Sequence, residues 1–194
     1  MGIFDKLKSN MGSSSTQPSQ LDKSVRSETF TFYALPESLA ELQSIPEASM
    51  SSPFQTAALT VLALCAYVAD QNIGIEMLDY LKGPRPLSVY DKQFLKDRLT
   101  TKNNLFVPFS YFNGATPQND YTPSEPFTIV VSSNPYSYRD EEGAHYATLY
   151  IASGGADSPR PVTLRQKGDQ WMLWEGEKSL FTGIRTAKSQ DPWA

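Results

Sequence analysis

The side chains that most often perform chemistry are scarce in this chain. Its 194 residues include one histidine, His145, and one cysteine, Cys65. Transition metals are held by clusters of His, Cys, Asp or Glu, so the sequence predicts no metal site and no cofactor. Cys65 lies within a long apolar segment, which indicates a buried core thiol rather than a nucleophile.

His145 follows the acidic run Asp140–Glu142 at the start of a predicted strand. A general base needs an oriented partner, and the loop composition predicts an exposed imidazole instead. The sequence lacks the G-x-S-x-G nucleophile elbow of serine hydrolases. Its glycine pair at 154 and 155 fits neither a Walker loop nor a G-x-G-x-x-G pattern. We therefore predict no catalytic residue.

Paired carboxylates leave an enzymatic alternative open. A glycoside hydrolase uses one carboxyl group as the acid and a second as the base or nucleophile, while aromatic side chains stack on the sugar. The carboxylates available for such a role are Glu125, Asp140, Glu141, Glu142, Asp157 and Glu175. The sequence does not place any two of them in one cleft. A carboxylate-dependent hydrolase acting on a sugar-like polar substrate is therefore an alternative and not the first hypothesis.

Residues 110–126 form the first loop that departs from ordinary linker composition. Its prolines fix the path of the chain, while Tyr111, Phe112 and Tyr121 offer amphipathic surface for a protein partner or a small polar ligand. The competing interpretation is a long connection held onto the core by the same aromatic rings.

Residues 153–161 form the second such loop. Asp157 and Arg160 are close enough in sequence to pair across a turn, and Gly154-Gly155 permits a tight bend. Asp157 and Arg160 are predicted to bind a ligand or partner, and Arg160 would hold a carboxylate or a phosphate. The competing interpretation is a turn whose polar groups satisfy one another.

Charge and the N-terminal segment limit the possible partners. The formal net charge is −4 and the pI is near 5.0, so a broad nucleic-acid surface is not expected.

Residues 1–10 place Ile3, Phe4 and Leu7 on one side of a helical turn beside two lysines, which permits docking to a membrane or a shell. No secretory signal is recognisable, and we expect a cytoplasmic protein.

The element that must organise the fold is residues 53–69, which are apolar on every side from Phe54 onward. Such a helix must be buried all round, and it is too short for the alternative of a membrane span. Ser52 is suited to the N-cap and Pro53 to the first helical position. Further helices are predicted at about 36–43, 73–82 and 88–99.

The second half of the chain has the character of strands and loops, because its prolines exclude long helices. Strands are predicted at about 127–131, 146–151, 161–165 and 170–175, with a possible extra strand at 28–33. Local connections favour an antiparallel meander. The expected fold class is α+β, with N-terminal helices packed on a C-terminal antiparallel sheet. We expect a short amphipathic peptide (1–10), a flexible linker (11–27) and one domain (28–194).

Several motifs together resemble an uncharacterised bacterial family known only as a domain of unknown function. They are Ser52-Pro-Phe-Gln-Thr-Ala-Ala-Leu-Thr-Val61, Leu81-Lys-Gly-Pro-Arg-Pro-Leu87, Tyr111-Phe-Asn-Gly-Ala-Thr-Pro117, Tyr121-Thr-Pro-Ser-Glu-Pro126, Ser153-Gly-Gly-Ala-Asp-Ser-Pro-Arg160 and Asp191-Pro-Trp193. The resemblance covers roughly Glu28 to the C-terminus. It implies a bacterial, mostly Firmicute-type cytosolic protein, and it brings no activity, ligand or catalytic residue.

These observations favour a non-enzymatic interaction or ligand-binding module of a bacterial cytosolic protein. The carboxylate-dependent hydrolase and a peripheral anchor docked through residues 1–10 are the alternatives.

Overall fold

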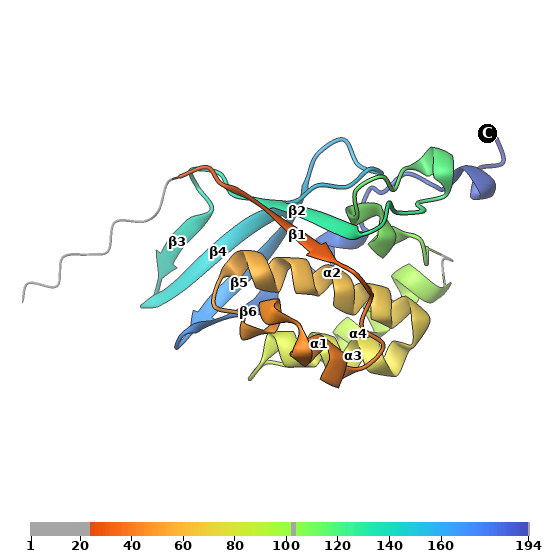
Figure 1. The fold of residues 1–194 in the computed structure, drawn as a ribbon. Coiled ribbons are helices and arrows are strands. Elements are labelled where there is room, and N and C mark those ends of the chain that lie inside the picture. The colour runs from red at the N-terminus through yellow and green to blue at the C-terminus, as the bar shows by residue number, and fades with distance from the viewer. Residues whose placement is uncertain (1–23, 102–103, 194) are drawn as a thin grey trace, which may run out of the picture.

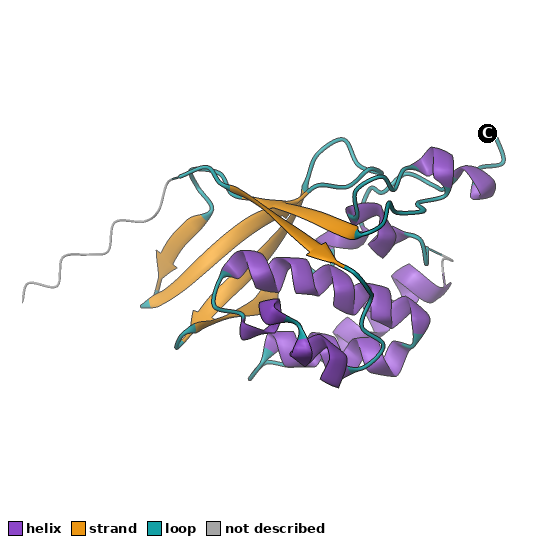
Figure 2. Ribbon diagram, in the orientation of Figure 1, coloured by secondary structure: helices purple, strands orange, loops and turns teal. Residues whose placement is uncertain are grey.

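Helices and strands gather on two sides of the molecule, as Figures 1 and 2 show. The structure is a computed structural model that describes residues 24–101 and 104–193. Its helices are α1 (Leu39–Ser44), α2 (Pro53–Ala69), α3 (Gln71–Lys82) and α4 (Val89–Leu95), and its strands are β1 (Ser27–Phe32), β2 (Phe127–Ser132), β3 (Tyr138–Glu141), β4 (Ala144–Ile151), β5 (Arg160–Lys167) and β6 (Gln170–Glu175). The predicted α+β class is confirmed.

Helix α2 begins and ends where the sequence predicts. Ser52 caps its N-terminus: the Phe54 N–H donates to Ser52 Oγ (3.3 Å), and the Ser52 N–H donates to Gln55 Oε1 (3.1 Å). Fourteen of the 17 residues of α2 are buried, from Pro53 to Tyr67 with Gln55 as the gap. Cys65 is among them, and burial raises the pKa of its thiol. The helix is therefore the centre of the core.

Helix α3 packs directly against α2. Gly74 of α3 lies so close to Tyr67 that a Cβ at position 74 would sit 2.2 Å from the Tyr67 Cα. No side chain fits into that space. The glycine therefore sets the distance between the two helices.

The sheet covers the other side of α2. Its strand order is β1-β2-β4-β5-β6, with β3 paired to β4 off this path, and every pairing is antiparallel. The predicted meander holds from β2 to β6, while β1 is separated from β2 in sequence by the helices. Residues buried against α2 alternate along the strands with partly exposed ones, for example Ala147 and Leu149 with Tyr146 and Thr148.

Three helix boundaries and one strand differ most from the prediction, while several strand ends differ by one or two residues. Helix α1 begins after Ser38, whose Oγ accepts from the Glu41 N–H (3.2 Å), so Pro36 does not open it. Helix α3 begins at Gln71 because Asp70 caps it. Helix α4 ends at Leu95 and continues as a π-helical segment, Lys96–Thr101. Strand β3 was not predicted, because three of its four residues are exposed and charged.

The loops at one end of the molecule are tied together in space. The Gly154 N–H donates to the Ser110 carbonyl (2.9 Å), and the Arg185 N–H donates to the Gly155 carbonyl (2.8 Å). The Tyr121 hydroxyl donates to the Arg185 carbonyl (2.6 Å). We call this packed set the loop cluster (residues 106–126, 153–160 and 180–190).

Helix α4 is fastened to the turn that follows β6. Lys178 Nζ lies 2.6 Å from Asp91 Oδ1, and Asp91 also accepts from the Ser88 N–H (2.9 Å) at the helix N-cap. Burial raises the pKa of Asp91, but the hydrogen bonds from Lys178 and Ser88 outweigh it and lower the pKa to about 2.

Within residues 24–101 and 104–193, no helix combines the length and the apolar character that crossing a membrane requires. The predicted N-terminal peptide (1–10) and most of the predicted linker (11–27) lie outside the described residues.

Gly74→Ala is expected to lower the free energy of unfolding by about 2 kcal/mol, because the added methyl forces α2 and α3 apart. The higher helix propensity of alanine, about 1 kcal/mol, offsets only part of that cost. Urea denaturation measures the change. Glu76→Ala, at an exposed site of the same helix, should change stability little, and a stabilised Gly74→Ala protein would contradict the close contact.

The Asp91 interactions predict an acid-dependent loss of stability. Because the folded-state pKa is lowered, the stabilisation is complete above the unfolded-state value near 4 and is lost as the pH falls toward about 2. The difference in unfolding free energy between wild type and Asp91→Asn should therefore shrink from pH 6 to pH 2 in urea titrations. A difference that stays constant over this range would show that Asp91 does not contribute through its charge. Glu76→Gln serves as the exposed control.

Tyr121→Phe should destabilise the protein by about 1–2 kcal/mol, because it leaves the Arg185 carbonyl without its hydrogen-bond donor. Thermal and urea unfolding measure the change. Tyr136→Phe is the control, since that side chain is 88% exposed and should tolerate the loss of its hydroxyl. Equal stability of the two variants would contradict a structural role for the Tyr121 hydroxyl.

Candidate functional site

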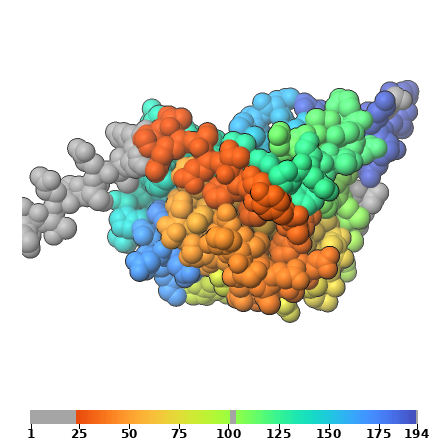
Figure 3. Space-filling model, viewed as in Figure 1, coloured from red at the N-terminus to blue at the C-terminus, as the bar shows by residue number. Residues whose placement is uncertain are grey.

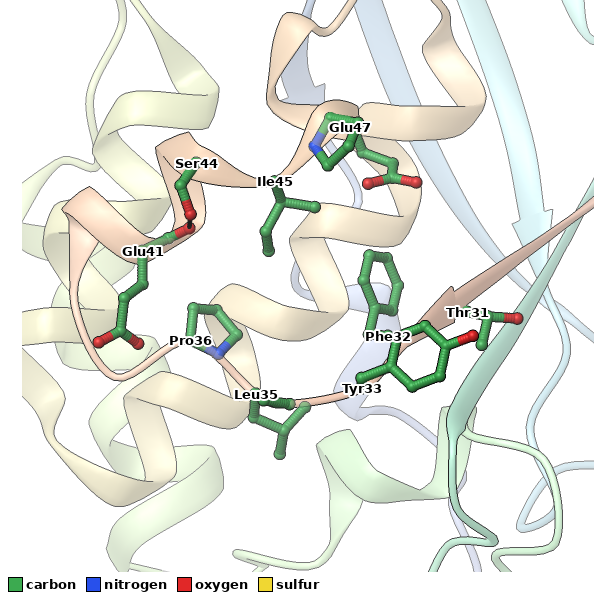
Figure 4. A pocket seen from close by; sticks show the side chains of 11 residues that line it. Thr31, Phe32, Tyr33, Leu35, Pro36, Glu41, Ser44, Ile45 and Glu47 are labelled. Atoms are coloured by element: carbon green, nitrogen blue, oxygen red, sulfur yellow. Dashed lines mark hydrogen bonds between the residues drawn. The ribbon is translucent and has the colours of Figure 1, made fainter.

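A groove of about 630 Å³ opens where β1 leaves the sheet and the chain turns into α1. We call it the β1–α1 groove. One wall is the segment 31–36 and the other comes from α1 and the residues after it (Figure 4). The volume lies within the range of ordinary ligand pockets.

Apolar side chains make the floor of the groove, and one aromatic ring stands at its mouth. Phe32 and Pro36 are buried, while Leu35 and Ile45 are half-buried. Tyr33 follows the last residue of β1 and is 89% exposed. An exposed tyrosine beside a half-buried apolar floor is typical of a recognition surface.

The backbone of β1 continues this surface, because β1 lies at one end of the sheet order. The Ser133 N–H donates to the Arg26 carbonyl (2.8 Å), and Arg26 precedes the first β1–β2 pair. Backbone bonds alternate along an antiparallel strand, so Thr29 and Thr31 direct their N–H and C=O groups away from β2. No other described strand pairs with them. Figure 3 shows that β1 runs along the molecular surface.

The charges of the groove are acidic. Glu41 and Glu47 line it, and among the described residues no lysine or arginine does. Glu41 Oε2 accepts from the Glu37 N–H (2.8 Å), which holds this carboxylate near the start of α1. The groove therefore suits an occupant that combines apolar and basic groups.

The aromatic residues of the first predicted loop point into the protein. Tyr111, Phe112 and Tyr121 are each 2% exposed. The Tyr111 hydroxyl donates to the Leu180 carbonyl (2.6 Å), and the Tyr121 ring stacks on Phe106 with centroids 5.0 Å apart. Burial raises the pKa of both hydroxyls, although Arg160 and Arg185 oppose the effect. These contacts favour the structural interpretation, and a binding role for the three residues stays a prediction.

The expected pair between Asp157 and Arg160 does not form. Arg185 Nη1 lies 2.6 Å from Asp157 Oδ1 instead. The Arg160 guanidinium donates to the carbonyls of Thr182 and Gly183, both at 2.9 Å. Residues 180–190, which the sequence did not assign to this region, supply these partners. The two predicted loops do meet in space. Within the loop cluster, however, the polar side chains of both loops form hydrogen bonds and ion pairs with neighbouring protein groups.

The Gly154-Gly155 pair also has a different role from the predicted tight bend. A Cβ at Gly154 would lie 1.9 Å from the Ala115 carbonyl oxygen, and one at Gly155 would lie 2.3 Å from the Tyr121 hydroxyl. The glycines therefore permit the close approach of the two loops.

The candidate catalytic groups are not gathered in the groove. His145 Nδ1 lies 2.6 Å from Asp140 Oδ1 across the β3–β4 hairpin, and both side chains are exposed. Glu125, Asp157 and Glu175 do not line the groove either. Within the described part of the chain, no group of three or more His, Cys, Asp or Glu side chains is arranged to hold a metal ion.

Sequence reasoning missed Tyr33, Leu35 and Ile45 as surface residues of one groove. The alternation at 28–33 placed Tyr33 on the polar side of a strand, and that signal was correct about its exposure. The convergence of the segment 31–36 with residues 41–47 depends on how α1 packs, which no local pattern specifies.

Comparisons with known proteins give a family and nothing finer. No curated protein and no solved structure matches the chain significantly. A family described as "Domain of unknown function (DUF6935)" matches residues 34–188, which include α1 to β6 and one wall of the groove. The chain belongs to the DUF6935 domain family.

Proposed function

We propose that this chain is a non-enzymatic interaction module that binds an extended segment of a protein partner in the β1–α1 groove. The observation that carries the proposal is the position of the groove at the end of β1, beside the edge of that strand to which no other described strand pairs. The resemblance of its motifs to a bacterial family supports a bacterial cytosolic setting.

The edge of β1 offers backbone partners for such a segment. A peptide added as a new strand forms main-chain hydrogen bonds, while alternate side chains enter pockets beside the strand. Thr29 and Thr31 would supply those backbone groups. The apolar side chains of the peptide would then reach Leu35 and Ile45 in the groove.

The charge of the groove specifies the partner further. Glu41 and Glu47 disfavour an acidic segment and attract lysine or arginine. We therefore infer an extended peptide in which apolar residues alternate with basic ones.

Selection from a displayed peptide library on the full chain tests this proposal. Peptides with alternating apolar and basic residues should be enriched, and Tyr33→Ser should weaken them about tenfold, the effect of losing about 1.4 kcal/mol of aromatic contact. Fluorescence polarisation measures the affinities. Tyr136→Ser is the matched control, because Tyr33 and Tyr136 are 89% and 88% exposed but only Tyr33 lines the groove.

Backbone methylation of a selected peptide separates strand pairing from simple apolar contact. Methylation at alternate amides should abolish binding at positions that face β1 and leave the intervening positions unaffected. Failure to enrich any such peptide, or equal binding by wild type and Tyr33→Ser, would reject the proposal.

A further inference from the structure

A row of cations and aromatic rings crosses the sheet on the face opposite α2. Arg139 lies over the Tyr146 ring (4.9 Å), Arg165 lies over both Tyr146 (5.5 Å) and Trp174 (4.7 Å), and Arg85 lies over Trp174 (4.4 Å). The rings of Tyr146 and Trp174 meet edge to face, with centroids 5.8 Å apart. Cation–π contacts hold each guanidinium in a defined position.

This row ends in a second hollow, of about 280 Å³, between the end of α3 and the strands β5 and β6. We call it the Trp174 pocket. Its charged lining consists of Lys82, Arg85, Arg165 and Lys167, and no described carboxylate lines it. That concentration of positive charge stands out in a chain whose net charge is −4.

One of these charges is already compensated. Lys82 Nζ lies 3.5 Å from Glu177 Oε1, with both side chains almost fully buried, and it donates to the Trp174 carbonyl (3.3 Å). Lys82 therefore fixes the strand that carries Trp174. Among the described residues, no carboxylate pairs with the remaining three, Arg85, Arg165 and Lys167.

The guanidinium groups of Arg85 and Arg165 make neither hydrogen bonds nor ion pairs with other described residues; the aromatic rings are their partners. By contrast, Arg139 donates to Thr148 Oγ1 (3.0 Å), and Arg185 pairs with Asp157. A guanidinium placed over a ring keeps the N–H donors in its own plane available for a ligand.

We propose that the Trp174 pocket binds the phosphate group of a small phosphorylated molecule. A phosphate monoester has three terminal oxygens and up to two negative charges, which match two guanidinium forks and one ammonium group. The small volume favours a compact molecule over a polymer. Met172 and Pro84 provide apolar surface for the rest of the ligand. This site shares no lining residue with the β1–α1 groove.

The direct test is a titration of the full chain with glycerol 3-phosphate, followed by ¹H–¹⁵N NMR at the Trp indole and Arg Nε–H resonances. Saturable shifts of Trp174, Arg85 and Arg165 are expected, while sodium acetate and sodium chloride at equal ionic strength give none. Equal saturable shifts with acetate, or shifts that follow ionic strength alone, would overturn the proposal.

Variants at the two arginines locate the site. Arg85→Gln and Arg165→Gln should each weaken glycerol 3-phosphate binding about tenfold, because each removes a charge-assisted donor. Arg85 is exposed in a loop, so its variant keeps the fold even if the Arg165 variant does not. Arg98→Gln is the matched control, since Arg98 also lies over a ring, Phe94 at 5.2 Å, but beside Asp97 and outside the pocket. Unchanged binding by Arg85→Gln would overturn the site.

The affinity for glycerol 3-phosphate should rise with pH. The second pKa of a phosphate monoester is about 6, while the guanidinium groups stay charged throughout. Binding of glycerol 3-phosphate should therefore tighten severalfold from pH 5 to pH 7.5, and an affinity that falls over this range would contradict the proposal.

A phosphoserine peptide provides the last comparison. Binding of that peptide tenfold more tightly than glycerol 3-phosphate would overturn the assignment to a small molecule.

Discussion

Helix α2 is apolar on every side and must therefore be buried on every side. The arrangement of the other elements follows from this requirement. The sheet packs on it, α3 approaches it at Gly74, and the segment Val107–Tyr111 lies against it as well. Since the sheet gives one face to α2, its other face is left outside the core. The surfaces open to ligands therefore lie along the edges of the sheet and on that outer face.

The same constraint explains how much of the fold the sequence predicts. The α2 pattern and its caps locate the helix to the residue, while alternation at residues 28–33 and strand-forming composition in the later segments identify β1, β2 and β4 to β6. The miss at β3 has a local cause, because Arg139, Asp140 and Glu141 carry no apolar alternation and pair only with β4. Pro36 suggested an early start for α1, but the Ser38 side chain bonds the Glu41 N–H and so fixes the start three residues later.

Local composition predicts much less about the candidate site. The loops at 110–126 and 153–161 are rich in side chains that bind ligands elsewhere, yet here Tyr111 and Tyr121 donate to backbone carbonyls of residues 180–190. Partners so distant in sequence leave no local signal. The same holds for the β1–α1 groove and the Trp174 pocket. Tyr33, Arg85 and Trp174 become part of a concave surface only because the packing of α1 and α3 brings other segments of the chain beside them.

The β1–α1 groove and the Trp174 pocket lie at the two opposite ends of the strand order, and their charges are opposite. Carboxylates on the groove disfavour a phosphorylated ligand, and cations around Trp174 disfavour a basic peptide, so the ligand proposed for each site would be excluded from the other. The two are nevertheless joined through β6. The segment Pro46–Ser49 begins in the groove wall, and Met50 follows it directly. The Trp171 N–H donates to the Met50 carbonyl (2.8 Å). Trp174 lies three residues after Trp171 in β6. Opposite charge therefore separates the two proposed ligands, while strand β6 connects the two surfaces.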